Sequence, residues 1–490
     1  MNEILLASPI VSLSILAIIA LVFDARDSKN TNFGYTFAFG TFVLTFLLSV
    51  YGWMGGFDSS IFVVAESLSK GALNFNPSAY FYDMLFVISA IFSMMASRPY
   101  FQREKAETTE FYNLVLFAVA GMMIIAHSAS MLTLFIGIEI MSLSFYIMAG
   151  YFRFNKKSVE ASLKYFLLGA FATGFLVYGM AMIYGATGSF YFDAIHSAIS
   201  SGTVHSFTYL KIGLAMMIVG LAFKAATFPF HQWAPDVYTG SPTPVTTFMS
   251  TAGKAAAIIS FIIVTAAIMP SITGIEAVDL NTSTAQTVIA LISAITMIVG
   301  NITALMQKNV KRMLAFSSVA HAGYLLMGIV ANSADGTRGM TFYITAYLFM
   351  QTGSFIIVSI FERNKNKNLE FSDYAGLYKK HPLMSALMAI FMFSLAGLPP
   401  MAGFFGKYLL FTAAIKAGFT WLTIVGVVSS VISMYFYIGL VLQMYFKESR
   451  DDVSMENKGG LASVPVYISA IIIMLLGVLP FLLDDVVLAF

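Results

Sequence analysis

Hydrophobic runs near the length of a membrane span recur along this whole chain, and they constrain its fold more than any other feature. A helix of about twenty apolar residues crosses the hydrocarbon core of a bilayer. Backbone groups inside a bilayer must satisfy one another, so consecutive runs of this kind predict an all-α polytopic membrane protein. The runs lie near 4–23, 33–53, 78–97, 112–131, 132–151, 162–185, 210–228, 244–268, 286–306, 313–331, 341–361, 383–415, 421–446 and 465–488.

One of these runs, 383–415, is too long for a single straight helix. It contains Gly397-Leu398-Pro399-Pro400, and proline both lacks a backbone donor and clashes with the preceding turn. We therefore expect a broken helix here, and about 14 transmembrane helices in all.

The composition excludes several classes of protein. Apolar residues make up 58% of the chain and charged residues 11%, against roughly 25% charged residues in soluble domains. A net charge of +2 gives no reason to expect a nucleic-acid partner. The absence of cysteine excludes disulfides, thiolate metal sites and iron–sulfur ligation by this chain. MNEILLASPI lacks the basic start and the cleavage site of a signal peptide, so we expect the first run to be retained.

The charges of the connectors predict an orientation. Most of the 27 Lys and Arg fall in alternate connectors, which places these connectors in the cytoplasm and both termini outside. The connector 229–243 has no Lys or Arg, and we expect it to pack within the protein. The cations expected inside are Arg26, Lys29, Arg98, Arg103, Lys105, Arg153, Lys156, Lys157, Lys164, Lys308, Lys311, Arg312, Arg363, Lys365, Lys367, Lys379, Lys380, Lys447, Arg450 and Lys458, and those outside are Lys70, Lys211, Arg338 and Lys416.

The order of the spans predicts two inverted repeats. Spans four to eight (112–268) and nine to thirteen (286–446) each contain five helices, so the two units have opposite topology. Each unit has a proline-broken helix beside a lysine, which is typical of transporters. We expect each repeat to form a proton half-channel. The three-helix segment 1–111 precedes the repeats, and a loop with the last helix (447–490) follows them.

Few ionisable side chains lie within the spans. Glu139, Lys224, Lys254, His321 and Lys407 are the candidates for proton translocation. A charge in mid-membrane costs roughly 2.5–3.5 kcal/mol on insertion scales, so its default interpretation is functional. Pro229 is expected to break the seventh span beside Lys224. The alternative is static buried pairs that only fix helix packing.

Other ionisable groups and motifs are expected to carry no translocation chemistry. Asp83 and His127 lie near span ends and are expected at the membrane interface. Gly253-Lys254 and Gly406-Lys407 lack the upstream glycine of a phosphate-binding loop. No metal-ligand spacing of His and carboxylates occurs, so any redox or nucleotide chemistry is expected on other chains.

Three motifs resemble one family. FKAATFPFHQWAPDVYTGSPTPVTTFMSTAGKAAA, KRMLAFSSVAHAGY and SLAGLPPMAGFFGKYLLF resemble the antiporter-like membrane subunits of respiratory complex I, the proton-pumping NADH:quinone oxidoreductase, and of multi-subunit sodium/proton antiporters. The similarity runs from about the third to the thirteenth span. GIEIMSLSFYIMAGY, Lys407 and the chain's end soon after the last span resemble the subunit N branch rather than L or M.

The resemblance implies roles for matching residues. Glu139 would pair with Lys224 of the seventh span, Lys254 would be the central lysine, and Lys407 would lie toward the outer exit. His321 would bridge Lys254 and Lys407. The resemblance also implies a bacterial inner-membrane location, neighbouring antiporter-like subunits as partners, and flavin, iron–sulfur clusters and quinone on partner subunits, with no redox centre here.

Two alternatives stay open at this point. The chain is also compatible with a subunit of a multi-subunit cation/proton antiporter or of a membrane-bound hydrogenase. The second alternative is a structural spacer with static charges.

Overall fold

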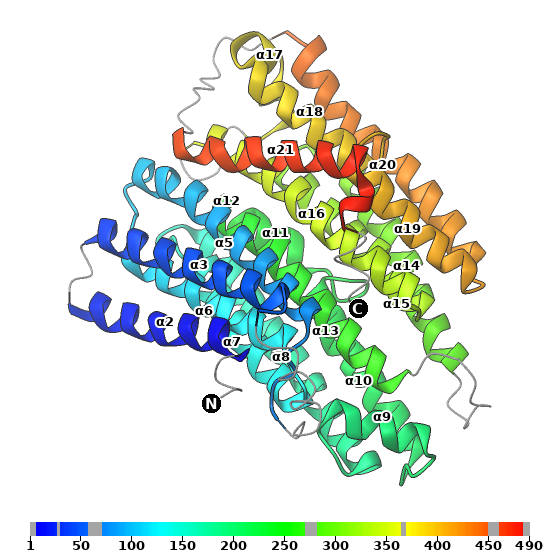
Figure 1. Ribbon diagram of the computed structural model, residues 1–490. Coiled ribbons are helices and arrows are strands. Elements are labelled where there is room, and N and C mark those ends of the chain that lie inside the picture. Colours follow the sequence, from blue (N-terminus) through cyan, green and yellow to red (C-terminus); the bar gives the residue numbers. More distant parts are fainter. Residues whose placement is uncertain are drawn as a thin grey trace.

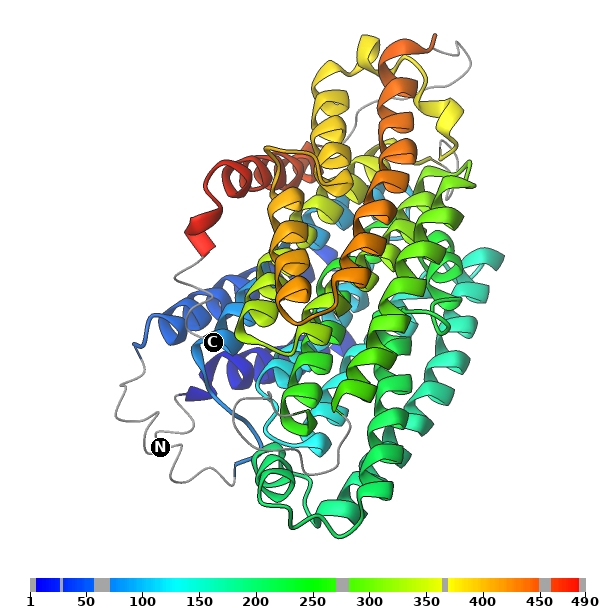
Figure 2. The ribbon, with the colours of Figure 1, turned by 90° about the vertical axis from the view of Figure 1, so that its right-hand side faces the viewer.

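The computed structural model describes residues 6–26, 30–56, 71–269, 282–363, 369–448 and 460–483, and these residues form a bundle of long, closely packed helices (Figures 1 and 2). The first part comprises α2 (Ser8–Arg26), α3 (Thr31–Trp53), α5 (Pro77–Arg103), α6 (Thr109–Ala126), α7 (Met131–Ala149), α8 (Lys156–Thr187), α9 (Phe192–Ser200), α10 (Phe207–Ala225), α11 (Trp233–Gly240), α12 (Thr243–Phe248) and α13 (Lys254–Ile268). The second part comprises α14 (Thr282–Leu305), α15 (Val310–Ala331), α16 (Ala334–Phe361), α17 (Leu377–Lys380), α18 (Pro382–Ala396), α19 (Ala402–Lys416), α20 (Thr420–Phe446) and α21 (Ser463–Val478).

The predicted membrane-spanning architecture is confirmed. Within the described ranges, 13 helices are long and apolar enough to cross a membrane. The helix expected to be broken, 383–415, is divided into α18 and α19, with Gly397 in the left-handed region where α18 ends. The broken helix, α18 with α19, adds one crossing to these 13, which gives the 14 crossings expected from the hydrophobic runs.

The helix α16 forms the centre of the bundle. It packs against α5, α12, α15, α18, α19 and α21, and its apolar window is completely buried. The long helices α8 and α20 lie at the periphery and expose many large hydrophobic side chains, such as Phe171 and Val431. An apolar surface of this extent is stable only in contact with lipid or with other membrane subunits.

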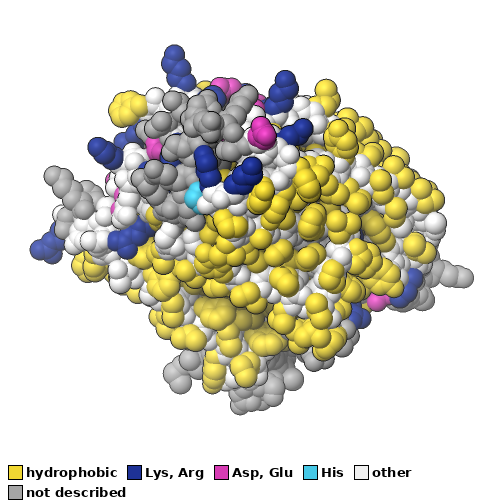
Figure 3. All heavy atoms as spheres, turned by 90° about the horizontal axis from the view of Figure 1, so that it is seen from above, with side chains coloured by type: hydrophobic (Ala, Val, Ile, Leu, Met, Phe, Trp, Pro, Cys, Tyr) yellow, Lys and Arg dark blue, Asp and Glu magenta, His cyan; other side chains and the backbone are white. Residues whose placement is uncertain are grey.

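Cations gather at one end of the bundle, which we call the basic end. It carries the last turn of α5, the first turns of α8 and α15, the whole of α17 and the end of α20. Figure 3 shows a broad hydrophobic surface, with most of the visible Lys and Arg side chains along its upper and left margins and a few at its lower right. The described cations of this end include Arg98, Arg103, Lys156, Lys157, Lys308, Lys379, Lys380 and Lys447.

The predicted connector 229–243 is packed within the protein. Most of its residues are buried, and it contains α11 and the turn that follows α10. Its carboxylate, Asp236, accepts from Lys164 at 2.9 Å and from Arg312 at 2.8 Å. The connector therefore joins α8 to α15 and needs no cations of its own.

Candidate functional site

The first helix interruption lies directly beside Lys224. The helix α10 ends at Ala225, and Ala226 takes a left-handed conformation with φ of 59° as the capping residue. The helix therefore stops before Pro229, which lies in the following turn, so the expected break at the proline was placed too far along the chain. Proline prevents the helix from continuing, but the left-handed cap determines where it ends.

Lys224 and Glu139 face each other, as the sequence predicted. Their charged groups lie 4.0 Å apart across α10 and α7. The Lys224 ammonium donates to the hydroxyls of Ser142 at 2.7 Å and Tyr146 at 3.3 Å, and Thr173 donates to Glu139 at 2.9 Å. The ammonium is buried, whereas the Glu139 side chain is 27% exposed. The acidic partner of this pair is thus accessible from the membrane-facing surface.

Lys254 lies at the start of α13, directly after a segment of π-helix. This segment, Met249–Gly253, joins α12 to α13, and the sequence analysis did not predict it. The buried Lys254 ammonium donates to the backbone carbonyl of Ser318 on α15. Short π-helical segments often occur at functional sites because the extra residue re-aims a side chain.

His321 is held between two tyrosines. Its Nδ1 lies 2.6 Å from the Tyr343 hydroxyl and its Nε2 lies 3.0 Å from the Tyr437 hydroxyl, which also bonds Ser317. Both Lys254 and Lys407 lie close enough to interact electrostatically with the ring. Sequence reasoning missed Tyr343 and Tyr437, because a tyrosine in an apolar run carries no local signal of its partner.

Lys407 lies against the end of the other half of the broken helix. Its ammonium donates to the carbonyls of Leu395 and Ala396, both at 3.1 Å, and to the Ser430 hydroxyl at 2.9 Å. The two carbonyls belong to the last turn of α18, which has no intrahelical donors for them and carries the negative end of the helix dipole. The ammonium also lies 4.8 Å from the centre of the Tyr324 ring.

Two expectations about peripheral charges were wrong. Asp83 and His127 were expected at the interface, but both are fully buried and paired at 2.9 Å, because His127 caps α6 against α5. Lys311 was expected in a connector, but α15 begins at Val310, so Lys311 already lies inside the bundle. The buried Glu362, which caps α16, was not predicted at all.

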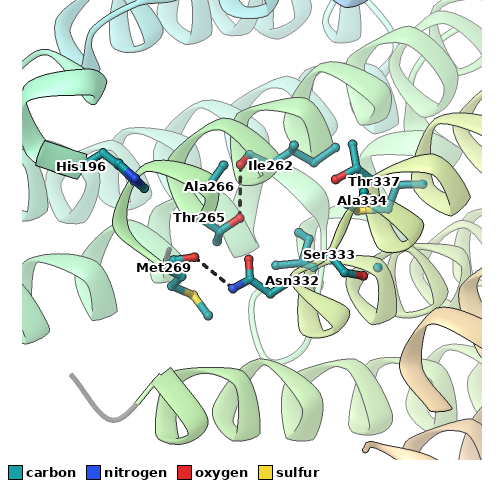
Figure 4. A pocket seen from close by; sticks show the side chains of 12 residues that line it. His196, Ile262, Thr265, Ala266, Met269, Asn332, Ser333, Ala334 and Thr337 are labelled. Atoms are coloured by element: carbon teal, nitrogen blue, oxygen red, sulfur yellow. Dashed lines mark hydrogen bonds between the residues drawn. The ribbon is translucent and has the colours of Figure 1, made fainter. Parts of the chain in front are cut away.

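A cavity of about 220 Å³ lies at the end of the bundle opposite the basic end (Figure 4). His196 of α9 lines one side, and Asn332 donates to the carbonyl of Met269 across it at 3.0 Å. None of the five predicted site residues lines this cavity. The described part of the chain contains no cluster of His and carboxylates that could hold a metal ion.

Buried titratable groups thus lie on α10, α13, α15 and α19, and the partly exposed Glu139 of α7 lies beside the first of them. The family described as NADH:quinone oxidoreductase/Mrp antiporter, TM, matches residues 128–433. The chain belongs to this family. The resemblance drawn from the motifs is therefore confirmed.

The relatives are more specific than the family description. The chain is 42% identical to "NADH-quinone oxidoreductase subunit N" of Trichlorobacter lovleyi, over 82% of this chain and 81% of that protein. It is 39% identical to "NADH-quinone oxidoreductase subunit N 1" of Chloroherpeton thalassium, over 99% of this chain and 98% of that protein. These relatives favour the subunit N branch that the motifs indicated.

Solved structures agree in fold. A chain of respiratory complex I from Thermus thermophilus with bound aureothin superposes with a TM-score of 0.80 at 30% identity, covering 97% of this chain and 98% of that one. A chain of the Mrp complex from Dietzia sp. gives a TM-score of 0.82 at 20% identity, covering 99% of this chain and 96% of that one. At that identity the Mrp match shows the fold alone.

Proposed function

We propose that this chain is a proton-translocating, antiporter-like membrane subunit of an NADH:quinone oxidoreductase. The observation that carries the proposal is the line of three buried lysines and one histidine through the interior of a member of this family. Buried charges in membrane spans are costly and usually mark an ion path. Polar contacts accompany each of these groups, so protons have neighbouring oxygens along the line.

The proton path follows the order of the groups. A proton enters from the cytoplasm near the interruption after α10 and loads Lys254. It then passes by way of His321, whose tyrosine partners and Ser317 supply hydroxyls, to Lys407. From Lys407 the proton leaves on the outer side. Each transfer moves a proton from an ammonium or imidazolium to the next neutral nitrogen, with hydroxyls and water between them.

The Glu139–Lys224 pair controls this path. A unit charge moved at about 6 Å, at an effective dielectric constant near 20, changes an electrostatic energy by roughly 3 kcal/mol. At such a separation, a change in the pairing of Lys224 with Glu139 alters the proton affinity of a neighbouring lysine, and Lys254 is the next lysine along the proposed path. The partial exposure of Glu139 supports a neighbouring antiporter-like subunit as the source of that change, since a partner can reach the carboxylate from this surface.

The proposal includes a division of the chain and an orientation. Residues 112–268 and 286–446 are the two inverted repeats, with 1–111 before them and 447–490 after them. Two features support the division: each range contains an interrupted helix, and each interruption lies beside a buried lysine. The basic end faces the cytoplasm of a bacterial inner membrane, and both termini lie on the outer side.

Electron transfer belongs to partner subunits in this proposal. The chain has no cysteine for iron–sulfur ligation. NADH oxidation at a flavin, the iron–sulfur clusters and quinone reduction would reside on other chains of the complex. The role of this chain in the overall translocase reaction is the movement of protons through its own side chains.

The second candidate is a subunit of a standalone cation/proton antiporter, because the description of the matching family also names Mrp antiporters. Purification of the intact complex through a tag on this chain discriminates the two. We expect flavin and iron–sulfur absorbance to co-purify with the tag, and NADH to drive proton uptake in inverted vesicles. A complex without redox absorbance that exchanges sodium for protons down an imposed gradient would overturn the proposal.

A further inference from the structure

Two charged groups at the basic end take no part in the path described above. Lys311 is 0% exposed and Glu362 is 1% exposed. They lie in the first turn of α15 and at the C-terminal cap of α16, so each is adjacent to a connector of the basic end. A buried charge carries an effective penalty of several kcal/mol unless it is well paired. The burial of one cation and one carboxylate at the basic end therefore needs an explanation.

These two groups belong to one junction of four helical segments. Lys311 Nζ donates to the Ser241 carbonyl at 2.7 Å, and Thr243 Oγ1 donates to the Glu362 carboxylate. The Glu362 carboxylate also interacts electrostatically with Lys311 and with Tyr100 of α5. We call Ser241, Thr243, Lys311 and Glu362 the basic-end cluster. It holds an acid and a base beside the start of the helix that leads to Lys254.

Hydroxyl groups follow one face of that helix from the cluster inward. Thr243, Thr247 and Thr251 recur every fourth residue, and Lys254 follows three residues after Thr251, at the end of the π-helical segment. Thr247 donates to the Thr243 carbonyl at 3.0 Å and Thr251 to the Thr247 carbonyl at 2.6 Å. The three threonines therefore span the helical segment between the cluster and Lys254, including part of its π-helical portion.

The neighbouring helix α16 also holds unpaired polar atoms at this depth, and Gln351 Nε2 donates to the Leu314 carbonyl of α15 at 3.4 Å. Gln351 Oε1 and Thr352 Oγ1 are buried and accept or donate no hydrogen bond among the described residues. Gln351 lies eleven residues before Glu362, at about the depth of Lys254, since α16 runs antiparallel to α12 and α13. Buried polar atoms of this kind are normally satisfied by a partner or by an ordered water molecule.

We propose that Glu362 and Lys311 form a proton-loading site at the basic end, which supplies Lys254 along the threonine face of α12. The Glu362 carboxylate takes a proton from cytoplasmic water, and Lys311 compensates its charge while it is ionised. The proton then passes through the hydroxyls and intervening water to the neutral Lys254 amine. Glu362 returns to the carboxylate and Lys254 becomes the ammonium.

The inference rests on the proposed translocation function, and the experiment separates the two. Glu362→Gln is compared with Lys254→Met in inverted vesicles that carry the intact complex, with assembly checked by native electrophoresis. We expect Glu362→Gln to lower NADH-driven proton uptake by roughly tenfold, less than the 10²–10⁴-fold typical of a lost proton-transfer group, because water bridges part of the gap. Glu362→Asp, which keeps the carboxylate, is expected to restore most of the rate.

Two further variants keep the test decisive. Lys308→Met removes an exposed cation three residues from Lys311 and is expected to leave proton uptake unchanged. Thr247→Val preserves shape while removing one hydroxyl, and a several-fold loss is expected even where Glu362→Gln fails to assemble. Normal uptake in Thr247→Val and Glu362→Gln, or equal rates for Gln and Asp at position 362, would overturn the loading site. If only Lys254→Met loses proton uptake, the loading site is overturned and the proposed function stands. If no variant loses proton uptake, the loading site and the proposed function are both overturned.

Discussion

The environments of Lys224 and Lys407 differ in how their charge is balanced. Lys224 lies beside a carboxylate that is partly exposed on the membrane-facing surface, with the two groups 4.0 Å apart. Lys407 has no acidic partner among its hydrogen bonds and instead meets two helix-end carbonyls and a serine hydroxyl. A charged partner can move or be screened from outside, whereas backbone carbonyls are fixed. The comparison suggests a responsive pair at one interruption and a fixed station at the other.

The largest effect is expected at the fixed station. Lys407→Met removes the ammonium from the carbonyls of Leu395 and Ala396 and from the Ser430 hydroxyl, which still donates to Ala396. Because Lys407 is the last carrier before the outer side in the proposed path, we expect NADH-driven proton uptake to fall by roughly 10²-fold, the lower end for a lost proton-transfer group. Stopped-flow dye measurements on inverted vesicles check this. Uptake within a factor of two of wild type would show that Lys407 is not a station.

A smaller effect is expected at the responsive pair. Glu139→Gln removes a charge whose interaction with Lys224 at 4.0 Å is worth roughly 4 kcal/mol at an effective dielectric constant of 20. Partial exposure and the remaining Ser142 and Tyr146 contacts reduce the loss, so we expect turnover to fall by about tenfold. Glu139→Asp serves as the matched control. Equal activity of the Gln and Asp variants would show that the charge itself is unimportant.

Gly397 tests whether the fixed geometry around Lys407 matters. This glycine has φ of 85°, and an added Cβ would lie 3.2 Å from Lys407 Nζ. Gly418 has the same φ of 85° with nothing within 4 Å of its Cβ, so it is a matched control. Both alanine variants should lose about 1–2 kcal/mol of stability from left-handed strain. We expect only Gly397→Ala to slow proton uptake, by a few-fold, and similar uptake in both variants would contradict a geometric role.

The smallest effect is expected at Asp236, outside both sites. Burial raises the pKa of this carboxyl, but hydrogen bonds and charge from Lys164 and Arg312 outweigh it, so the pKa lies below its ordinary value of 3.8. A depressed pKa stabilises the fold above the ordinary pKa, and this stability is lost as the pH falls through the folded-state pKa. Because the side chain is 35% exposed, Asp236→Asn should cost at most about 1 kcal/mol at neutral pH. Thermal unfolding of the solubilised complex at several pH values checks this.

The sequence predicted the hydrophobic framework. It also named five site residues, whose role in translocation stays a prediction, but it did not predict their surroundings. Length and hydropathy define a span, so the membrane-spanning helices and the break at Gly397 could be predicted from the sequence. The π-helical segment before Lys254, the left-handed cap at Ala226 and the tyrosines around His321 depend on contacts between distant helices. Lys311 looked like an ordinary connector cation, because the residues beside it in the sequence do not indicate that its ammonium donates to the distant Ser241 carbonyl.

Lys254→Met tests the central claim most directly, because Lys254 lies between the two compared regions and donates to the carbonyl of Ser318. The measurement is the ratio of protons taken up to NADH oxidised in inverted vesicles, made beside quinone-reductase turnover and a check of complex assembly. We predict that uptake and turnover collapse together while the complex stays intact. A wild-type ratio at wild-type turnover would contradict the account and leave these lysines as packing groups.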